Sequence, residues 1–384
     1  MRLKRLTMLA IGLAILAQMA QADWMPTKRL TWTSGWSEYP AVATDPFGII
    51  HLVWLDDTPG NYEIYYKKSA NGGDTWTGAK RLTWNPAVPK SQPKIAADSS
   101  GHLHVVWHDS ALGNAEIYYR RSTDGGASWT AGLAISGTSG ESYLGNIVVD
   151  SSDNLVVAWR DDTAHGIYCT KSTNGGVSWL PSQRITWLSG WSNFPCLATG
   201  PSGSLHVVWR NDTSGNQEIY HTKSTDGGAS WTVAKRITWT SGSSDRPSLA
   251  VDPSGNLQLV WQDDTPGNVE IYYRKSADGG ATWPTVRRLT WTPSWTDRPS
   301  IAADSWGNLH VVWEDQTDGW EIYYKKSNDG GASWTPNKRI TWGNRDCVWP
   351  GVAVDNYNYV HVVWTYGCPA YPGEIYYRYY EVVY

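Results

Sequence analysis

The pattern of hydrophobic and polar positions repeats along the chain about every 50 residues. Each unit holds four short runs: one that follows a proline, as at 299–304, an apolar run ending in tryptophan, as at 310–313, then EIYY and R-(L/I)-T-W. The runs are rich in β-branched and aromatic residues, and turn residues separate them. No segment beyond the first 22 residues shows a helical period. The pattern therefore predicts an all-β chain of four-stranded units.

The ends of the chain set the number of units. The apolar run ending in tryptophan occurs seven times, and the fourth run occurs six times with a degenerate copy around Ile135. A fourth run already stands at 29–32, whereas the last unit ends at EIYYRYY without one. An N-terminal strand can complete that unit and leave no free sheet edge. We predict a single domain over 23–384, a seven-bladed β-propeller of four-stranded blades closed by its N-terminal strand.

A turn-rich phrase stands between the third and fourth runs of six units, and its form STDGGASW is identical at 122–129 and 224–231. It resembles the Asp-box, or BNR repeat, of the sialidase superfamily. That resemblance implies a β-propeller, although sialidases imply six blades, and Asp-box propellers also include lectins and surface proteins that hydrolyse nothing. We interpret the phrase as scaffold opposite the inter-blade loops, with its tryptophan plugging the blade. Its signature residues are Asn71, Asp124, Asn174, Asp226, Asp278 and Asp329.

Function is expected where these copies differ, at two positions beside the inter-blade loops. One position precedes the proline of the first run or its equivalent, and holds Tyr39, Gln92, Leu144, Phe194, Arg246, Arg298 and Trp349. The other follows the tryptophan of the second run, and holds Leu55, His108, Arg160, Arg210, Gln262, Glu314 and Thr365. Four arginines on consecutive blades could hold a carboxylate or sulfate. The alternative is local pairing with Asp161, Asp212, Asp245 and Asp297.

Aromatic residues add to the same face. Trp36, Trp191 and Trp295 lie on predicted inter-blade loops, and Trp349 occupies the variable position. Flat rings on one face suit stacking against sugars, as in propeller lectins, although a loop tryptophan can also cap its own blade. The predicted ligand-binding residues are therefore these four tryptophans together with Arg160, Arg210, Arg246 and Arg298.

The resemblance to sialidases implies three arginines for a substrate carboxylate, a tyrosine nucleophile paired with a glutamate, and an aspartate acid/base. Arg246 and Arg298 are each followed by proline, similar to the family's Arg-Ile-Pro motif without its middle residue. Tyr39 or Tyr366 could act as nucleophile and Glu314 as its partner, but the sequence does not pair them. We expect no metal and no cofactor, because five of the nine histidines occupy the repeated second-run position, where packing explains them.

Residues 1–22 resemble a secretory signal, with a basic start, an apolar core over 9–17 and a small-residue cleavage site at 20–22. Removing them takes away three basic residues, which leaves 29 Lys and Arg against 36 Asp and Glu, a net charge of −7. That charge argues against nucleic acid as a partner. We expect a secreted or cell-envelope monomer with no membrane span after cleavage. A disulfide between Cys347 and Cys368 is predicted, and pairing of Cys169 with Cys196 is left open.

These observations favour an exported propeller that binds a glycan, or another extracellular ligand, on the inter-blade-loop face. The alternative is an exo-α-sialidase-like glycoside hydrolase. A second alternative is a structural propeller of the cell envelope that contacts another surface protein.

Overall fold

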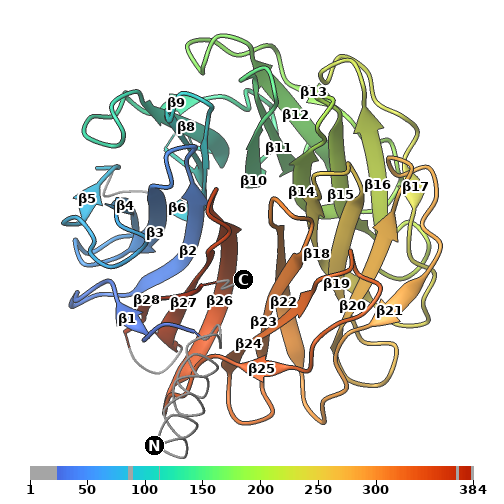
Figure 1. The fold of residues 1–384 in the computed structure, drawn as a ribbon. Helices are drawn as coiled ribbons and strands as arrows, with labels where there is room; N and C mark the ends of the chain where they lie inside the picture. Colours follow the sequence, from blue (N-terminus) through green and yellow to red (C-terminus); the bar gives the residue numbers. More distant parts are fainter. Residues whose placement is uncertain (1–23, 85–89, 112, 369–371, 382–384) are drawn as a thin grey trace, which may run out of the picture.

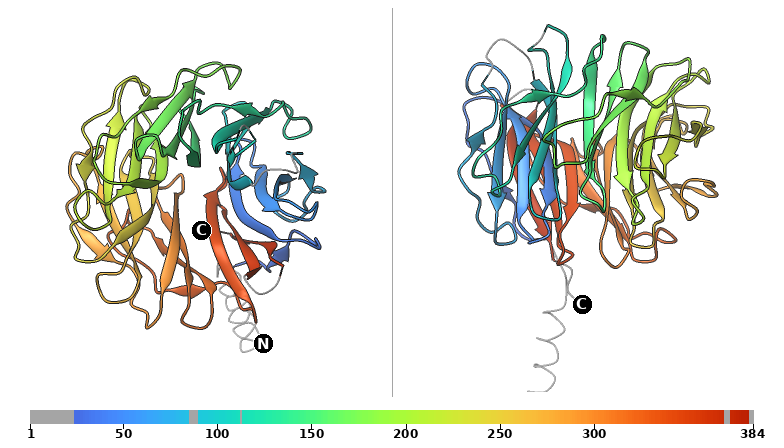
Figure 2. Two further views of the ribbon diagram at one scale, coloured as in Figure 1. Left: turned by 180° about the vertical axis from the view of Figure 1, so that it is seen from behind. Right: turned by 90° about the horizontal axis from the view of Figure 1, so that it is seen from above.

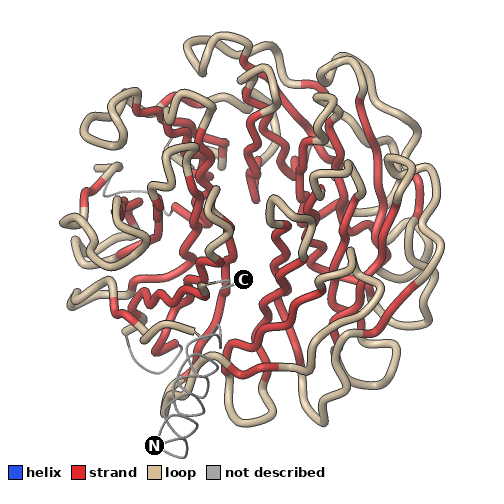
Figure 3. The backbone as a smooth tube through the Cα atoms, in the orientation of Figure 1, coloured by secondary structure: helices blue, strands red, loops and turns tan. Residues whose placement is uncertain are grey.

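The chain forms a ring of seven antiparallel sheets with four strands each (Figure 1). This computed structural model describes residues 24–84, 90–111, 113–368 and 372–381, so the expected signal at 1–22 lies outside the described residues. Within those ranges the chain consists of strands and loops, with no helix (Figure 3). The predicted all-β propeller of seven blades is confirmed.

Each blade runs outward from the centre of the ring through four strands. The first strands are β2 Ser37–Thr44, β6 Lys90–Ala97, β10 Ser142–Val149, β14 Ser192–Thr199, β18 Ser244–Val251, β22 Thr296–Ala303 and β26 Asp346–Val354. The second are β3 Ile50–Asp56, β7 Leu103–Asp109, β11 Leu155–Asp161, β15 Leu205–Asn211, β19 Leu257–Asp263, β23 Leu309–Asp315 and β27 Val360–Cys368. The third are β4 Glu63–Ser69, β8 Glu116–Ser122, β12 Gly166–Ser172, β16 Glu218–Ser224, β20 Glu270–Ser276, β24 Glu321–Ser327 and β28 Glu374–Tyr380. The fourth are β5 Lys80–Arg81, β9 Leu133–Ala134, β13 Gln183–Arg184, β17 Lys235–Arg236, β21 Val286–Arg288, β25 Lys338–Arg339 and β1 Lys28–Arg29.

The ring closes as the sequence predicts. Strand β1 pairs with β28, with Lys28 opposite Tyr377, and thereby completes blade 7 in the order β1-β28-β27-β26. The fourth strands cover only the beginning of the R-(L/I)-T-W run. In blade 7, Arg29 Nε donates to the carbonyl of Thr31 at 2.7 Å, and Trp32 beyond it is exposed.

Neighbouring blades face one another around the ring (Figure 2), and the core lies between them rather than inside any one sheet. In one cluster, Val53 and Ile64 of blade 1 pack with Leu103 and Val105 of blade 2. The repeated second-strand tryptophans are buried in this layer, which explains why every unit keeps one. Stability therefore depends on each blade having two neighbours.

The repeated second-strand histidines serve packing, as expected. His51 Nδ1 lies 2.9 Å from the hydroxyl of Tyr66, and His51 Nε2 lies 3.2 Å from Asp45. Blade 5 has Gln258 at this position, and its amide keeps both bonds, to Tyr273 at 2.6 Å and to Asp252 at 2.8 Å. A glutamine that preserves the same connections shows that the position needs a buried bridge.

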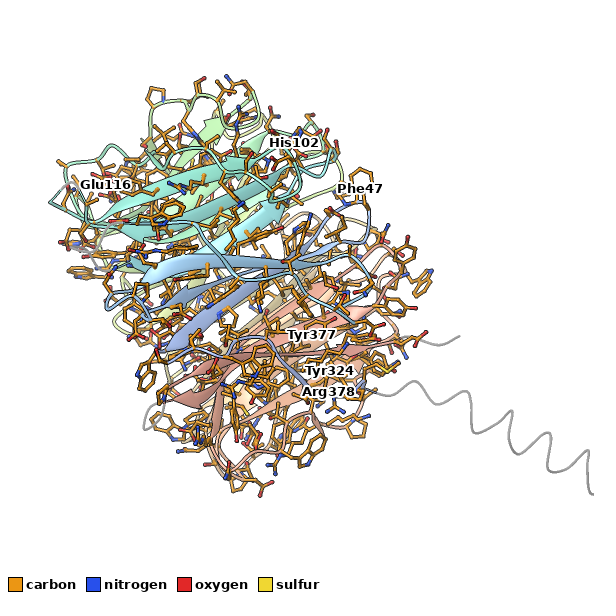
Figure 4. The ribbon with its side chains drawn as sticks, turned by 90° about the vertical axis from the view of Figure 1, so that its left-hand side faces the viewer. Phe47, His102, Glu116, Tyr324, Tyr377 and Arg378 are labelled. Carbon is orange, nitrogen blue, oxygen red and sulfur yellow. The ribbon has the colours of Figure 1, made fainter. Side chains whose placement is uncertain are left out.

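The Asp-boxes lie between the third and fourth strands, at the end of each blade away from the inter-blade loops. We call these two ends the box face and the loop face. Figure 4 shows the blades side-on, with Glu116 at the loop face and with Phe47 and His102, in the hairpins between first and second strands, at the opposite end. In the box at 122–129, Asp124 accepts from the Ser128 amide at 2.8 Å. This bonding confirms that the box shapes a turn.

The box tryptophan was expected to plug its own blade, and that expectation was wrong. Trp129 of blade 2 packs edge-on against Tyr66 of blade 1, with ring centroids 5.2 Å apart. Trp76 packs in the same way on Tyr377 of blade 7 at 5.1 Å. The reason is that the third-strand tyrosine of one blade reaches under the box of the next. The box therefore joins blades to each other.

Candidate functional site

A bulge in the first strand of each blade sets the variable position apart from the repeated frame. The pairing of first and second strands shifts at this point in every blade, for example between Glu38 and Ala41. The variable residue itself has a left-handed backbone in all seven blades, with φ between 46° and 59°. None of the seven is glycine, so in each the left-handed backbone is less favourable in free energy than an extended one. The seven are Tyr39, Gln92, Leu144, Phe194, Arg246, Arg298 and Trp349.

These side chains surround the loop-face end of the central channel. Two adjoining hollows lie there, with volumes of about 320 and 530 Å³. We call the residues that line both hollows the mouth; they are Tyr39, Gln92, Leu144, Phe194, Arg246 and Arg298. Trp349 lines the first hollow, and Arg160, His108 and Tyr143 line the second. The volumes are in the range of sites that hold small ligands.

The structure brings three of the four predicted arginines together. Arg246 and Arg298 line both hollows and Arg160 lines the second, whereas Arg210 lies outside the described lining. Each also pairs with a carboxylate, so the two expectations of convergence and of pairing both hold in part. Arg160 bonds Asp162 at 2.6 Å rather than the expected Asp161.

Two of the arginines pair with an aspartate of the next blade, although local pairing between residues close in sequence was expected. Arg210 of blade 4 lies 3.4 Å from Asp245 of blade 5, and Arg246 of blade 5 lies 3.5 Å from Asp297 of blade 6. Asp212 instead accepts from the Trp191 backbone amide at 2.7 Å. Asp245 and Asp297 therefore each hold an arginine of the preceding blade.

Two carboxylates hold the guanidinium of Arg298 in place. Its guanidinium donates to Glu314 and lies 3.7 Å from Asp297. The second oxygen of Glu314 accepts from the Trp349 amide at 2.9 Å, and the glutamate is fully buried. Burial raises the pKa of Glu314 to about 7, and the Arg298 charge opposes that rise. Both carboxylate oxygens are thus engaged in holding Arg298 and Trp349.

Aromatic rings line the same opening. Tyr39 of blade 1 stacks on Trp349 of blade 7, with centroids 4.2 Å apart. Phe194 lies beneath the guanidinium of Arg246 at 4.8 Å. Trp191 is not among the residues that line the hollows; it stacks on His165 at 3.7 Å and faces Arg160 at 5.3 Å. Around the channel end, the adjacent Arg246 and Arg298 therefore have aromatic rings on both sides, an arrangement suited to an acidic or polar ring-shaped ligand.

Other predicted residues lie away from the hollows. Trp295 is exposed and Trp36 is half-buried on their loops, and neither is among the described lining residues. The Tyr366 hydroxyl donates to Asn344 at 2.8 Å, and neither residue lines the hollows. Of the two candidate nucleophiles, only Tyr39 stands at the mouth.

Two buried polar atoms at the hollows have no hydrogen-bond partner among the described residues. They are Nε1 of Trp349 in the first hollow and Nδ1 of His108 in the second. A buried donor without a partner carries a free-energy cost that a bound ligand or water would remove. Burial also lowers the pKa of His108 to about 4, so this ring is neutral near pH 7.

Cys347 is buried, and burial raises the pKa of its thiol above the ordinary value. The side chain of Cys368 lies outside the described residues, so the predicted disulfide stays a prediction. Cys169 and Cys196 are free thiols and are not paired with each other. Over the described ranges, the structure contains no group of His, Cys, Asp or Glu that could hold a metal ion. No helix in those ranges is both long and apolar enough to cross a membrane.

Comparing the repeated units of the sequence did not identify several residues that line the hollows. Lys94, Tyr143 and Asn146 line them but were not predicted as site residues. For two of them the signal was present, since Lys94 and Asn146 stand two residues beyond the variable position, where the other copies differ as well. The periodicity gave no reason to prefer that position, because only the bulge turns it toward the channel.

The fold and this site define an Asp-box β-propeller with a variable channel mouth, and comparison with known proteins agrees. Residues 23–196 match the model of the BNR repeat-like domain. This match, together with the seven-bladed ring, confirms the predicted resemblance to sialidase-like BNR propellers. No curated protein matches the chain in sequence.

Solved structures with the same fold include proteins that act on glycans. An ulvan lyase bound to a glucuronate–sulfated rhamnose unit superposes with a TM-score of 0.67 at 10% identity, covering 91% of this chain and 95% of the lyase. An α-L-arabinanase from Penicillium chrysogenum gives 0.58 at 14% identity, covering 94% and 99%. The NanB sialidase of Streptococcus pneumoniae gives 0.53 at 14% identity, covering 91% and 70%. At such identities these similarities establish the fold alone.

Proposed function

We propose that this protein is an exported propeller that binds a glycan at the mouth of its central channel. One observation carries the proposal: seven non-glycine residues, of six different types, hold a left-handed backbone at the same point of a repeated frame. Strain of this kind persists where the surroundings enforce it and is concentrated at functional sites. The frame is repeated, whereas the side chains that it presents differ from blade to blade.

The chemistry of the mouth suits a carbohydrate. Sugar rings have apolar faces that stack on aromatic side chains, and Tyr39, Phe194 and Trp349 provide such rings at the first hollow. Arg246 and Arg298 provide donors in a fixed fork that matches a carboxylate or a sulfate. The partly engaged guanidinium groups are held in place by Asp297 and Glu314, which reduces the entropy lost on binding.

Glycoside hydrolysis of the sialidase type is the second candidate function. It is favoured by the position of Tyr39, a possible nucleophile, beside Trp349 and Arg298 in the first hollow. Against it, Glu314 is buried and its two oxygens are bonded to Arg298 and to the Trp349 amide, which disfavours the exchange of a proton with Tyr39. A binding role is therefore the better supported of the two.

The decisive experiment mixes the chain beginning at Asp23 with sialyllactose and records saturation transfer and free sialic acid in one NMR sample. We expect saturation transfer without release of sialic acid over about a day. The double variant Arg160→Ala, Arg246→Ala should weaken binding about tenfold or more, because it removes two cations from the hollows. Arg287→Ala is the matched control, since Arg287 is exposed on β21 near the box face.

Release of sialic acid that the double variant abolishes would make the protein a hydrolase. If a panel of acidic and neutral glycans gives no saturation transfer, the binding proposal is wrong and a structural role in the cell envelope becomes the better account. Export is tested separately by mass spectrometry of protein collected outside the producing cell. A mature chain beginning at Asp23 is expected there, whereas intact residues 1–22 would contradict export.

A further inference from the structure

A second ring of side chains lies deeper in the channel, two residues beyond each mouth position. Its members occupy equivalent points of the blades, since each pairs with a second-strand residue in the same register, as Lys94 does with Val106 and Ser248 with Val260. Six of the seven are uncharged, and the seventh is lysine. The ring consists of Ala41, Lys94, Asn146, Cys196, Ser248, Ser300 and Gly351.

The first hollow is lined by three cationic side chains, Lys94, Arg246 and Arg298, and by no carboxylate among its described lining residues. The two arginines direct part of their charge away from the hollow, toward Asp297 and Glu314. No described residue forms an ion pair or a hydrogen bond with the Lys94 ammonium. Its positive charge is therefore uncompensated by the protein around it.

The surroundings of Lys94 make an anion more favourable there than in bulk water. The side chain is accessible from the channel, but protein encloses that channel on its sides. Burial lowers the pKa of Lys94, and the nearby Cys196 opposes the shift. An ammonium group that has lost part of its hydration attracts an anion more strongly, because the effective dielectric constant around it is lower.

We propose that Lys94 forms the floor of an acid-binding subsite in the first hollow, which takes the carboxylate or sulfate group of an acidic glycan. This inference rests on the proposed function and specifies its ligand class. The acidic group enters past Arg246 and Arg298 and meets the ammonium below, while the sugar ring stays at the level of Tyr39 and Trp349. The nearby hydroxyls of Ser248 and Ser300 line the same hollow.

The test compares sialyllactose, sulfated lactose and neutral lactose by titration calorimetry on three proteins. Lys94→Met removes the charge and keeps most of the volume, Lys94→Arg keeps a charge, and Arg287→Met removes an exposed cation near the box face. We expect Lys94→Met to weaken both acidic ligands about tenfold or more and to leave lactose unchanged. Lys94→Arg should retain most of the affinity, and Arg287→Met should bind as the unmodified protein does.

Equal affinity of the acidic ligands for the unmodified protein and for Lys94→Met would overturn the subsite while leaving glycan binding at the mouth intact. A second experiment, an NMR titration with sulfate, tests the anion site itself if no glycan binds. Sodium sulfate is titrated into protein carrying carbon-13 methyl labels on its lysines, and the signal that disappears in Lys94→Met is followed. A shift of that signal without binding of any glycan would assign the subsite to free inorganic anions and overturn the glycan assignment. No shift would overturn the anion site itself.

Discussion

Each blade uses a left-handed backbone in two places, and the two places are built in opposite ways. At the box face, the second glycine of every Asp-box has φ between 80° and 92°. At the mouth, the variable residue has φ between 46° and 59° and is never glycine. The box face repeats glycine, the one residue type that adopts this conformation freely. The mouth repeats the conformation but places different side chains on it.

Neighbouring blades explain the difference. A Cβ atom on Gly126 would lie 2.3 Å from the hydroxyl oxygen of Tyr66 in the preceding blade, so no side chain fits. At the mouth the equivalent direction opens into the hollow, where Phe194 or Arg246 has room. Contact between blades therefore restricts the residue at the box face, whereas no such contact restricts the side chain at the mouth. The predictions below test this contrast, beginning with the largest effect.

The sharpest test uses the two identical boxes at 122–129 and 224–231. Gly126→Ala combines backbone strain with overlap against Tyr66, and we expect a loss of about 3 kcal/mol in the free energy of unfolding. Gly228 has nearly the same φ, 92° against 88°, but its nearest neighbour is a methyl carbon of Leu205 at an ordinary 3.4 Å. Gly228→Ala should therefore lose only about 1 kcal/mol. Urea denaturation of both variants measures the difference.

The two glycines differ because blade 3 has Cys169 where blade 2 has Tyr119 and blade 1 has Tyr66, the tyrosines that reach under the next box. Equal losses in the two variants would mean that the backbone conformation alone requires glycine. The contrast between box face and mouth would then lie in the turn and not in the neighbouring blade.

A second test uses the buried bridge of blade 4, where His206 Nδ1 lies 3.2 Å from His221 Nε2. Burial lowers the pKa of His206 to about 4 and that of His221 to about 3. As pH falls through about 6.5, these two rings take up protons in the unfolded chain but not in the folded chain, so stability is lost between about pH 6.5 and 3. One such histidine costs about 2 kcal/mol at pH 5.

Blade 5 supplies the replacement, because its Gln258 and Tyr273 form the same bridge without a titrating group. The double variant His206→Gln, His221→Tyr removes two such histidines, so it should lose about 4 kcal/mol less than the unmodified protein between pH 7 and pH 5. Thermal unfolding at both pH values measures this, with His102→Gln as a control for a partly exposed histidine. If the two proteins lose stability in parallel, other groups govern the acid response and the bridge is not its source.

The repeated part of the molecule could be predicted from the sequence, because its signals are local. The strands, the seven blades, the closure by β1 and the turn made by Asp124 all follow from periodicity and turn chemistry within one unit. The edge-on contact of Trp129 with Tyr66 joins two units, and no pattern inside one unit reveals it. The pairing of Arg246 with Asp297 was missed as a cross-blade contact for the same reason.

The mouth was located correctly by comparing copies, but its backbone could not be predicted. A residue before proline normally adopts an extended conformation, so Tyr39, Gln92 and Arg298 read as ordinary strand residues. The structure instead gives them a left-handed backbone within a bulge. The bulge brings Lys94 to the channel, which is why a lysine in a strand pattern was not identified as a site residue.

The smallest predicted effect concerns the strain at the mouth itself. Gln92 has φ of 46°, so Gln92→Gly removes the steric cost but adds flexibility to the unfolded chain, and the net change should be between 0 and about 1 kcal/mol of stabilisation. Ser91→Gly, one residue earlier in the same strand, should instead lose about 1 kcal/mol. Urea denaturation separates the two, and glycan titration of Gln92→Gly reports whether the side chain contributes to binding. A large loss of stability in Gln92→Gly would show that this side chain supports the fold, and the mouth would then share the constraint of the box face.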